Sequence, residues 1–262
     1  VRRTGPSLDK LNQISLDRSF EIYKERFADA SDFVFTFVGS FTVESIKPLL
    51  LQYLGGLPAN NRKEKAVDLG IKIPAGVVSK AVYMGQEPKA TVRLVFSGDF
   101  VYNRDNNNQI DALAEVLNIK LIERLREDEG GVYGVSASAS QSKYPQNRYS
   151  LSISFGCAPE NVEKLIASTL DEINKIKTNG ALPVDIQKFV AEETRSTETD
   201  LKTNGFWLGS IIDSYQNEED PKEILTYLDS LKKINPENLK SAANQYLSGK
   251  NYIRLVLMPE KK

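Results

Sequence analysis

A regular alternation of apolar residues and serines near the middle of the chain constrains its fold more than any other feature. Between residues 149 and 155 the apolar positions are Tyr149, Leu151, Ile153 and Phe155, and a serine stands at each position between them. This period of two predicts a β-strand that is buried on one face and solvated on the other. Such a strand is typical of a sheet that is covered on one face only.

Other apolar runs predict the rest of the sheet. Strand patterns occur at residues 33–38, 77–84, 90–96, 132–140 and 252–258. The first of these runs is apolar on both faces, which predicts a central strand covered on both sides. The second and third runs are separated by the turn sequence Gly-Gln-Glu-Pro, so we expect them to form a hairpin.

Apolar residues at helical spacing predict helices between these strands. Ser15 precedes the first helix as a candidate N-cap, and another helix follows from about Thr42. Residues 103–108 superficially resemble a calcium-binding loop, but Ile110 and Val116 occupy the positions that need glycine and glutamate, so we expect the asparagines to cap the next helix instead. Strands at the beginning and the end, with helices in pairs, favour an α+β fold with a mixed, mostly antiparallel sheet covered on one face by helices.

Composition excludes several classes of partner. The 262 residues carry a net charge of −1, with 40% hydrophobic and 26% charged residues, as is typical of a soluble globular protein. The balanced charge gives no indication of a nucleic-acid or anionic-membrane partner, and no apolar run approaches the ~20 residues that span a bilayer. The chain starts at Val1, so we expect a processed or excised piece in which residues 1–14 are the stub of an interdomain linker and residues 15–262 form a single domain.

Two further features of the composition limit the chemistry. Histidine is absent, so this chain alone cannot build a histidine-dependent triad or a zinc site with imidazole ligands. Cysteine occurs once, at Cys157, which excludes an internal disulfide and a thiolate cluster. Because Cys157 ends the alternating strand and has no histidine to serve as its base, we expect it to be a small core residue.

The segment from Leu125 to Val135 is the candidate site. A helical pattern ends there, Gly130 and Gly131 can adopt the positive φ that stops a helix, and a strand pattern begins at Val132. One interpretation is structural: Arg126 favours the negative end of its helix, and Tyr133 is a strand aromatic whose parity points it at the core. The other is functional, because the turn places a guanidinium and a phenol near the same sheet edge, where each can donate a hydrogen bond to a carbonyl oxygen.

Six segments in order give the chain a resemblance to a known family. They are Phe37–Ser40, Tyr53–Pro58, Leu125–Glu127 with Gly131–Tyr133, Lys143–Pro145, Phe155–Glu160 and Leu255–Glu260. The chain from about Ser15 to Glu260 resembles one domain of the pitrilysin (insulinase) family of inverted-motif zinc peptidases, which includes the mitochondrial processing peptidases. The last three segments are most similar to the carboxy-terminal domain of large bacterial zinc proteases. The resemblance implies a processing-peptidase-like fold.

In that family the metal is held in the amino-terminal half by an H-x-x-E-H helix and a distant glutamate. This chain lacks histidine and therefore resembles the carboxy-terminal half, which supplies an Arg–Tyr pair to the active site. Arg126 and Tyr133 stand at the matching positions. By resemblance, Arg126 would orient a substrate carbonyl and Tyr133 would donate to the oxyanion that develops during hydrolysis.

The function implied by this resemblance is that of a non-catalytic, substrate-binding domain of a zinc metalloendopeptidase, inactive by itself. Its partner would be the amino-terminal zinc-binding half of the same polypeptide or a separate catalytic subunit, which would hold the zinc. The substrate would be a peptide or an unfolded protein, and the location the periplasm or cell envelope. The alternative is a pseudo-peptidase scaffold or protein-interaction domain with no proteolytic role. A free-standing small-molecule enzyme is disfavoured, since the sequence has no phosphate loop, dinucleotide fingerprint or nucleophile elbow.

Overall fold

The computed structural model describes residues 5–260, and its contacts divide the chain into two compact units, Val1–Ala66 and Val67–Lys262. This division differs from the predicted single domain of residues 15–262, which stays a prediction. Each unit is described by itself.

The first unit contains three helices in its described residues. They are α1 (Leu8–Asn12), α2 (Leu16–Phe27) and α3 (Val43–Tyr53). The two predicted helix starts are confirmed, since the side chain of Ser15 accepts a hydrogen bond from the backbone of α2 and Thr42 forms a capping box with Ser45 at the start of α3. The predicted linker stub includes α1, and its residues 1–4 lie outside the described part of the chain.

The prediction of a buried central strand at residues 33–38 is wrong. The structure assigns no strand there, and Val34, Phe35 and Phe37 are exposed. A strand needs a neighbour that takes up its backbone N–H and C=O groups, and the described residues of the first unit contain no strand to pair with it. Residues 33–38 therefore have the apolar pattern of a strand but no neighbouring strand to pair with.

The second unit contains a five-stranded sheet and its covering helices. The strands are β1 (Val77–Tyr83), β2 (Ala90–Asp99), β3 (Val132–Ser142), β4 (Arg148–Cys157) and β5 (Tyr252–Met258). The α-helices are α4 (Arg104–Leu121), α5 (Val162–Asn179), α6 (Pro183–Asp200), α7 (Asn204–Gln216), α8 (Tyr227–Leu231) and α9 (Pro236–Tyr246). A π-helix follows α4 (Ile122–Asp128), and two 3₁₀ turns lie at Pro159–Asn161 and Pro221–Thr226.

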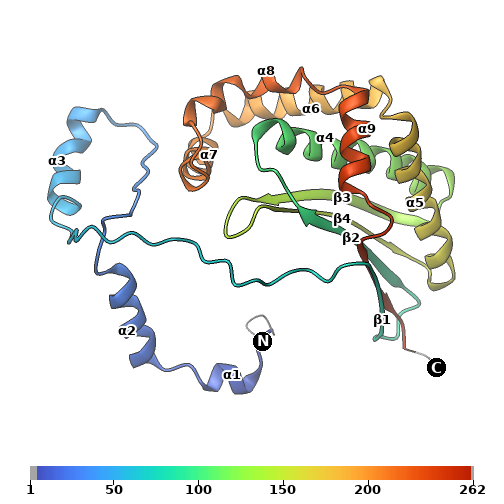
Figure 1. Cartoon of the computed structure of the whole chain (residues 1–262), viewed down its shortest axis with the longest axis horizontal. Helices are drawn as coiled ribbons and strands as arrows, with labels where there is room; N and C mark the ends of the chain where they lie inside the picture. Colours follow the sequence, from blue (N-terminus) through green and yellow to red (C-terminus); the bar gives the residue numbers. More distant parts are fainter. Residues whose placement is uncertain (1–4, 261–262) are drawn as a thin grey trace. The chain divides into compact units, whose positions relative to one another are not determined.

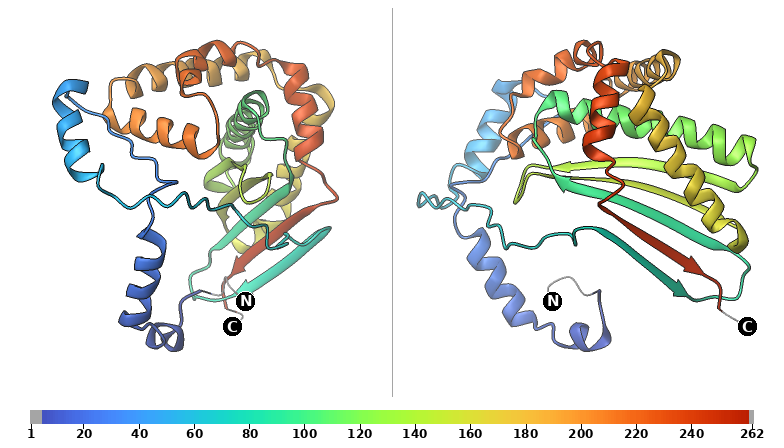
Figure 2. Two further views of the ribbon diagram at one scale, coloured as in Figure 1. Left: turned by 60° about the vertical axis from the view of Figure 1, so that its left-hand side comes forward. Right: turned by 45° about the vertical axis from the view of Figure 1, so that its right-hand side comes forward.

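The strand order is β1-β5-β2-β4-β3, with one parallel pair, β1 with β5, and antiparallel pairing elsewhere. In Figure 1 and in both views of Figure 2, α4, α5, α6 and α9 lie on one side of this sheet. The predicted α+β class and one-sided covering are therefore confirmed. The predicted hairpin between β1 and β2 is wrong, because β5 lies between these two strands.

The alternation of apolar residues and serines at residues 149–155 lies on β4 and matches its burial. Leu151 and Ile153 are fully buried against the helices, whereas the serines between them are partly exposed on the other face. Asn103 caps α4, as expected, and this helix crosses the covered face of the sheet with several fully buried side chains. Tyr149 joins α9 to the sheet by donating to the Tyr246 carbonyl at 2.8 Å, and burial raises the pKa of Tyr149 to about 12.

Substitution on the two faces of β4 should have opposite consequences for stability. Ile153→Ala should lower the free energy of unfolding by about 3 kcal/mol, because it removes methyl groups from the core and leaves a cavity. Ser154→Ala, on the neighbouring residue of the open face, should change it by less than about 0.5 kcal/mol. Urea unfolding followed by the fluorescence of the single tryptophan, Trp207, measures both. Equal losses in the two variants would contradict the one-sided burial.

Candidate functional site

The turn from α4 to β3 is built on a tightened backbone. After α4 the chain continues as a π-helix, whose Leu125 is fully buried in the core. The N–H of Gly131 donates to the Leu125 carbonyl at 2.9 Å, and the N–H of Glu129 donates to the Arg124 carbonyl at 3.1 Å. Gly130 has φ +57°, the left-handed conformation in which glycine commonly ends a helix. The predicted glycine turn is therefore present.

Gly131 fits a close approach between this turn and α5. A Cβ atom at residue 131 would lie 2.6 Å from Cδ2 of Leu165. Leu165 is 1% exposed and belongs to the core, so it has little room to move away. The turn therefore rests directly on the first turns of α5.

Glu129 fastens the same turn to α5 through charged hydrogen bonds. Its Oε1 accepts from Arg124 Nε at 2.7 Å and from the Ser168 hydroxyl at 2.7 Å, and Lys164 Nζ lies 3.3 Å from Oε2. Burial by itself raises the pKa of Glu129, but the hydrogen bonds from Ser168, Arg124 and Lys164 outweigh it and lower the pKa below the ordinary 4.5. The carboxylate is therefore held charged between the turn and the helix.

Sequence reasoning missed this network and the π-helix. The three partners of Glu129 come from the π-helix and from α5, more than thirty residues further along the chain in two cases. The one available signal was the acidic run Glu127–Glu129 at the end of a helix, where negative charge is unfavourable unless it is paired.

Tyr133 points away from the core, which corrects the expectation from strand parity. Val132 pairs with Cys157 and Val135 pairs with Phe155, so three steps along β3 match two steps along β4. This β-bulge inserts one extra residue and changes the parity on either side of it. Val132 and Ala137 are consequently both buried, whereas Tyr133 is 96% exposed.

Arg126 is also exposed, in the last turn of the π-helix. Arg126 directly follows Leu125, and Tyr133 comes two residues after Gly131. The backbone hydrogen bond between Leu125 and Gly131 therefore holds both residues at one end of the edge strand β3. Neither side chain makes a hydrogen bond or an ion pair with any residue in the described range 5–260. A guanidinium and a phenol with free donors therefore face solvent at this end of the sheet, where they can donate to carbonyl or oxyanion oxygens. The roles of Arg126 and Tyr133 in catalysis stay a prediction.

The residues of this chain do not fit a zinc ion. There is no histidine, and no three Cys, Asp or Glu side chains within residues 5–260 gather closely enough to hold a metal. Cys157 is 5% exposed in the core, as predicted, and burial raises the pKa of its thiol. None of the helices in the described range is both long and apolar enough to cross a bilayer.

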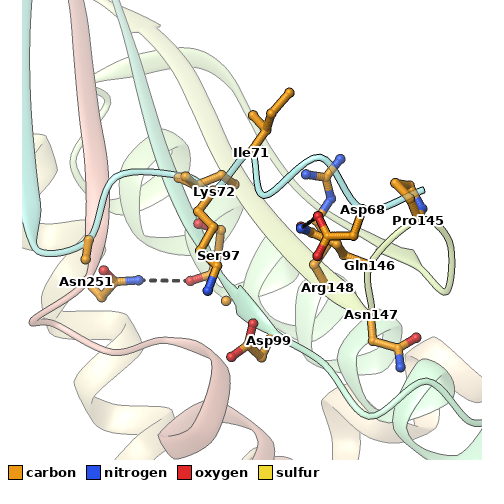
Figure 3. Close-up of a pocket in the computed structure, with 13 residues that line it drawn as sticks. Asp68, Ile71, Lys72, Ser97, Asp99, Pro145, Gln146, Asn147, Arg148 and Asn251 are labelled. Carbon is orange, nitrogen blue, oxygen red and sulfur yellow. Dashed lines mark hydrogen bonds between the residues drawn. The ribbon is translucent and has the colours of Figure 1, made fainter. Parts of the chain in front are cut away.

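A cavity of about 500 Å³ lies where residues 68–75 run beside the sheet (Figure 3). Some of its polar groups bind one another: Gln146 donates to Asp68, Asn251 donates to the Ser97 carbonyl at 2.9 Å, and the N–H of Gly76 donates to Asn251 at 2.8 Å. These bonds fasten the segment before β1 to the sheet. These three hydrogen bonds are therefore structural contacts.

Known proteins resemble the chain over most of its length. Residues 13–196 match the family model described as the peptidase M16 inactive domain. A protein of Arabidopsis thaliana named "Zinc protease PQQL-like" is 25% identical over 279 residues, an alignment that covers 97% of this chain and 29% of that protein. This chain therefore spans less than a third of the length of that curated relative.

Two solved structures share the fold. The periplasmic protease PqqL from Escherichia coli superimposes with a TM-score of 0.73 at 23% identity, covering 85% of this chain and 25% of that chain. A peptidase M16 inactive domain from Pseudomonas fluorescens gives a TM-score of 0.75 at 17% identity, covering 97% of this chain and 61% of that chain. At these identities the likeness shows the fold.

Replacing Glu129 should destabilise the second unit in a pH-dependent way. Glu129→Gln removes charge-assisted hydrogen bonds, which should lower the free energy of unfolding by about 1–2 kcal/mol at neutral pH. Because the folded-state pKa of Glu129 is lowered, its contribution is complete above the unfolded-state pKa and is lost as the pH falls through the folded-state pKa. Thermal melts of both proteins should therefore converge in acid.

Glu127→Gln is the matched control, because it removes the same charge two residues earlier. Glu127 is exposed and has no partner among residues 5–260, so this substitution should leave the melting temperature nearly unchanged. Equal losses in the two variants, or a loss in Glu129→Gln that persists in acid, would contradict the anchoring role.

Proposed function

The chain belongs to the peptidase M16 inactive-domain family, and on this premise we propose that it is the substrate-binding carboxy-terminal domain of a longer zinc metalloendopeptidase. In this proposal Arg126 and Tyr133 contribute to an active site whose zinc ligands lie in another domain. The observation that carries it is the exposure of Tyr133, an aromatic residue at the start of a strand that a β-bulge turns out of the core and leaves without a partner in the described range.

The proposed roles follow from the chemistry of the two side chains. Arg126 offers a planar fork of N–H donors, which suits a peptide carbonyl better than the single ammonium of lysine does. Tyr133 offers one hydroxyl, which would stabilise the oxyanion that develops on the attacked carbonyl. Both groups stand on a turn that Glu129 and Gly131 fix to α5, and such fixed donors cost little reorganisation when the charge develops.

The partner proposed for this domain is the amino-terminal zinc-binding half of the same polypeptide, or a separate catalytic subunit. Its support is that the chain covers 29% of the Arabidopsis zinc protease and 25% of the solved E. coli protease. Zinc is assigned to that partner, because this chain's own residues do not fit the metal. The proposed substrate is a peptide or an unfolded protein.

The proposed location is the periplasm or cell envelope. It is supported by the E. coli relative, which is described as a periplasmic protease. The alternative to the whole proposal is a scaffold or protein-interaction domain without a proteolytic role, which the lack of histidine in this chain permits. An H-x-x-E-H helix in the partner half would favour the peptidase.

Substitution of the pair should reduce turnover and leave folding intact. Tyr133→Phe removes one exposed hydroxyl, so the melting temperature should not change, while turnover by the full-length enzyme should fall about 100-fold if the hydroxyl stabilises the oxyanion. Arg126→Lys keeps the charge but loses the planar fork and should also lower turnover. Both are measured on an unfolded protein substrate, beside a thermal melt.

Tyr215→Phe and Arg195→Lys are the controls for these two variants. Tyr215 is an exposed tyrosine of α7, and Arg195 is an exposed arginine of α6 that pairs with Glu192. Neither control should alter turnover. Wild-type rates in Tyr133→Phe and Arg126→Lys would refute the catalytic role and favour the scaffold.

The chain by itself should neither hydrolyse peptides nor bind zinc tightly. The physical reason is the lack of imidazole, of a thiolate cluster and of convergent carboxylates in residues 5–260. Metal analysis of the purified chain, together with a peptidase assay with and without chelator, measures both properties. Stoichiometric zinc at sub-micromolar affinity would contradict the assignment of the metal to the partner.

A further inference from the structure

A second cavity, of about 600 Å³, opens among α4, α6, α7 and the segment 217–227 of the second unit. We name it the acidic cavity for the six carboxylates in its lining: Glu193, Asp200, Asp213, Glu219, Asp220 and Glu223. One cationic side chain, Arg104, lines it with them. It lies outside the turn that carries Arg126 and Tyr133.

Most of this negative charge is not neutralised within the second unit. Arg104 pairs with Glu223 at 3.4 Å, and Glu193 accepts a hydrogen bond from the Tyr227 hydroxyl at 2.7 Å. By contrast, the carboxylates of Asp213 and Glu219 have no hydrogen bond or ion pair with any residue in the described range. Two carboxylates of the lining are therefore free to take an external cation.

The titration of neighbouring groups agrees with an excess of negative charge. Burial raises the pKa of Glu219, and the nearby Glu223 raises it further, although Lys143 and Arg104 oppose this. Burial and then the charge of Glu219 raise the pKa of Tyr102, another lining residue. A cation in the cavity would relieve this repulsion.

Thr197 is an independent sign of a ligand. This residue of α6 lines the cavity and is 6% exposed, yet its hydroxyl makes no hydrogen bond with the described residues. The hydroxyl oxygen is not closed off from solvent, and the residue that carries it lines the cavity. Buried polar side chains normally have a hydrogen-bond partner, and Thr197 offers the cavity a hydroxyl that has none in the described range.

The kind of cation follows from the geometry and from the apolar part of the lining. No three carboxylates in residues 5–260 converge as metal ligands, so scattered acceptors favour a ligand with several N–H donors over a divalent ion. The side chains of Phe206 and Ile224 add apolar surface. A methylene stem with a charged, donor-rich head matches this combination, and such a stem packs on apolar and aromatic side chains.

We propose that the acidic cavity binds a cationic side chain, arginine above all, of a polypeptide that docks on this domain. Arginine fits best because its guanidinium carries five N–H donors in a plane. Gln141 of β3 lines the cavity, and Tyr133 lies eight residues earlier on the same strand, a separation of roughly 27 Å at ~3.4 Å per residue. The binding site would act whether or not Tyr133 takes part in catalysis.

The test uses the 262-residue chain and a fluorescein-labelled, unstructured peptide with one arginine, beside the same peptide with citrulline, which is neutral. Fluorescence anisotropy at low and at physiological salt gives the two dissociation constants. The arginine peptide should bind at least about tenfold more tightly, since charged hydrogen bonds distinguish the two. Equal affinities would overturn the proposal.

Variants show whether the acidic cavity is the site. Asp213→Asn should weaken the arginine peptide about tenfold and leave the citrulline peptide unchanged, and Glu219→Gln should do the same. Asp171→Asn is the control: it removes the same charge from an exposed position on α5, outside the lining, and should have no effect. Thermal melts establish that each variant is folded.

Two results would overturn the assignment. The first is an equal weakening by Asp171→Asn and Asp213→Asn, which would show non-specific attraction to a negatively charged surface. The second is displacement of the peptide by calcium or magnesium that binds stoichiometrically at micromolar concentrations, which would show a divalent-metal site. Either outcome leaves the proposed roles of Arg126 and Tyr133 untouched, because those are measured by turnover.

Discussion

The sheet of the second unit depends on the pairing of its last strand. β5 pairs in parallel with β1 and antiparallel with β2, and the described pairing of β1 is with β5. Val256 of β5 is buried opposite Val92 of β2, so the covered core extends into the strand at the end of the chain. Because β1 is attached through β5, the backbone groups of β1 find their partners only when the end of the chain has joined the sheet.

A second constraint acts at the opposite edge of the sheet. The turn into β3 is pressed against Leu165 at Gly131 and is bonded to α5 through Glu129. The bulge that follows returns Ala137 to the covered face and leaves Tyr133 outside. Tight packing therefore does not conflict with an exposed aromatic residue: the packed turn determines where the exposed side chain stands.

Local sequence patterns predicted most helices and strands, whereas the order of the strands and the bulge in β3 depend on pairing between distant segments. The cap at Ser15, the helix start near Thr42, the asparagine cap of α4 and the alternation of β4 are local properties, and the structure confirms them. The hairpin across residues 85–88 was a local expectation that failed, because β5 comes from the far end of the chain. The bulge before Val135 could not be predicted for the same reason, because a bulge is defined by how β3 pairs with β4. The glycine turn of the candidate site was predictable, but its anchors on α5 were not.

The edge strand β3 connects the candidate site to the acidic cavity, and its edge is partly blocked. The N–H of Ala137, midway along the strand, already donates to the Asn118 side chain at 3.2 Å. A polypeptide lying along β3 would have to displace Asn118 before it could form a continuous ladder of backbone hydrogen bonds. Backbone pairing along the whole edge is therefore costly. Recognition through side chains at the two ends of the strand, near Tyr133 and near Gln141, avoids that cost. The acidic cavity beside Gln141 therefore complements the hydrogen-bond donors beside Tyr133.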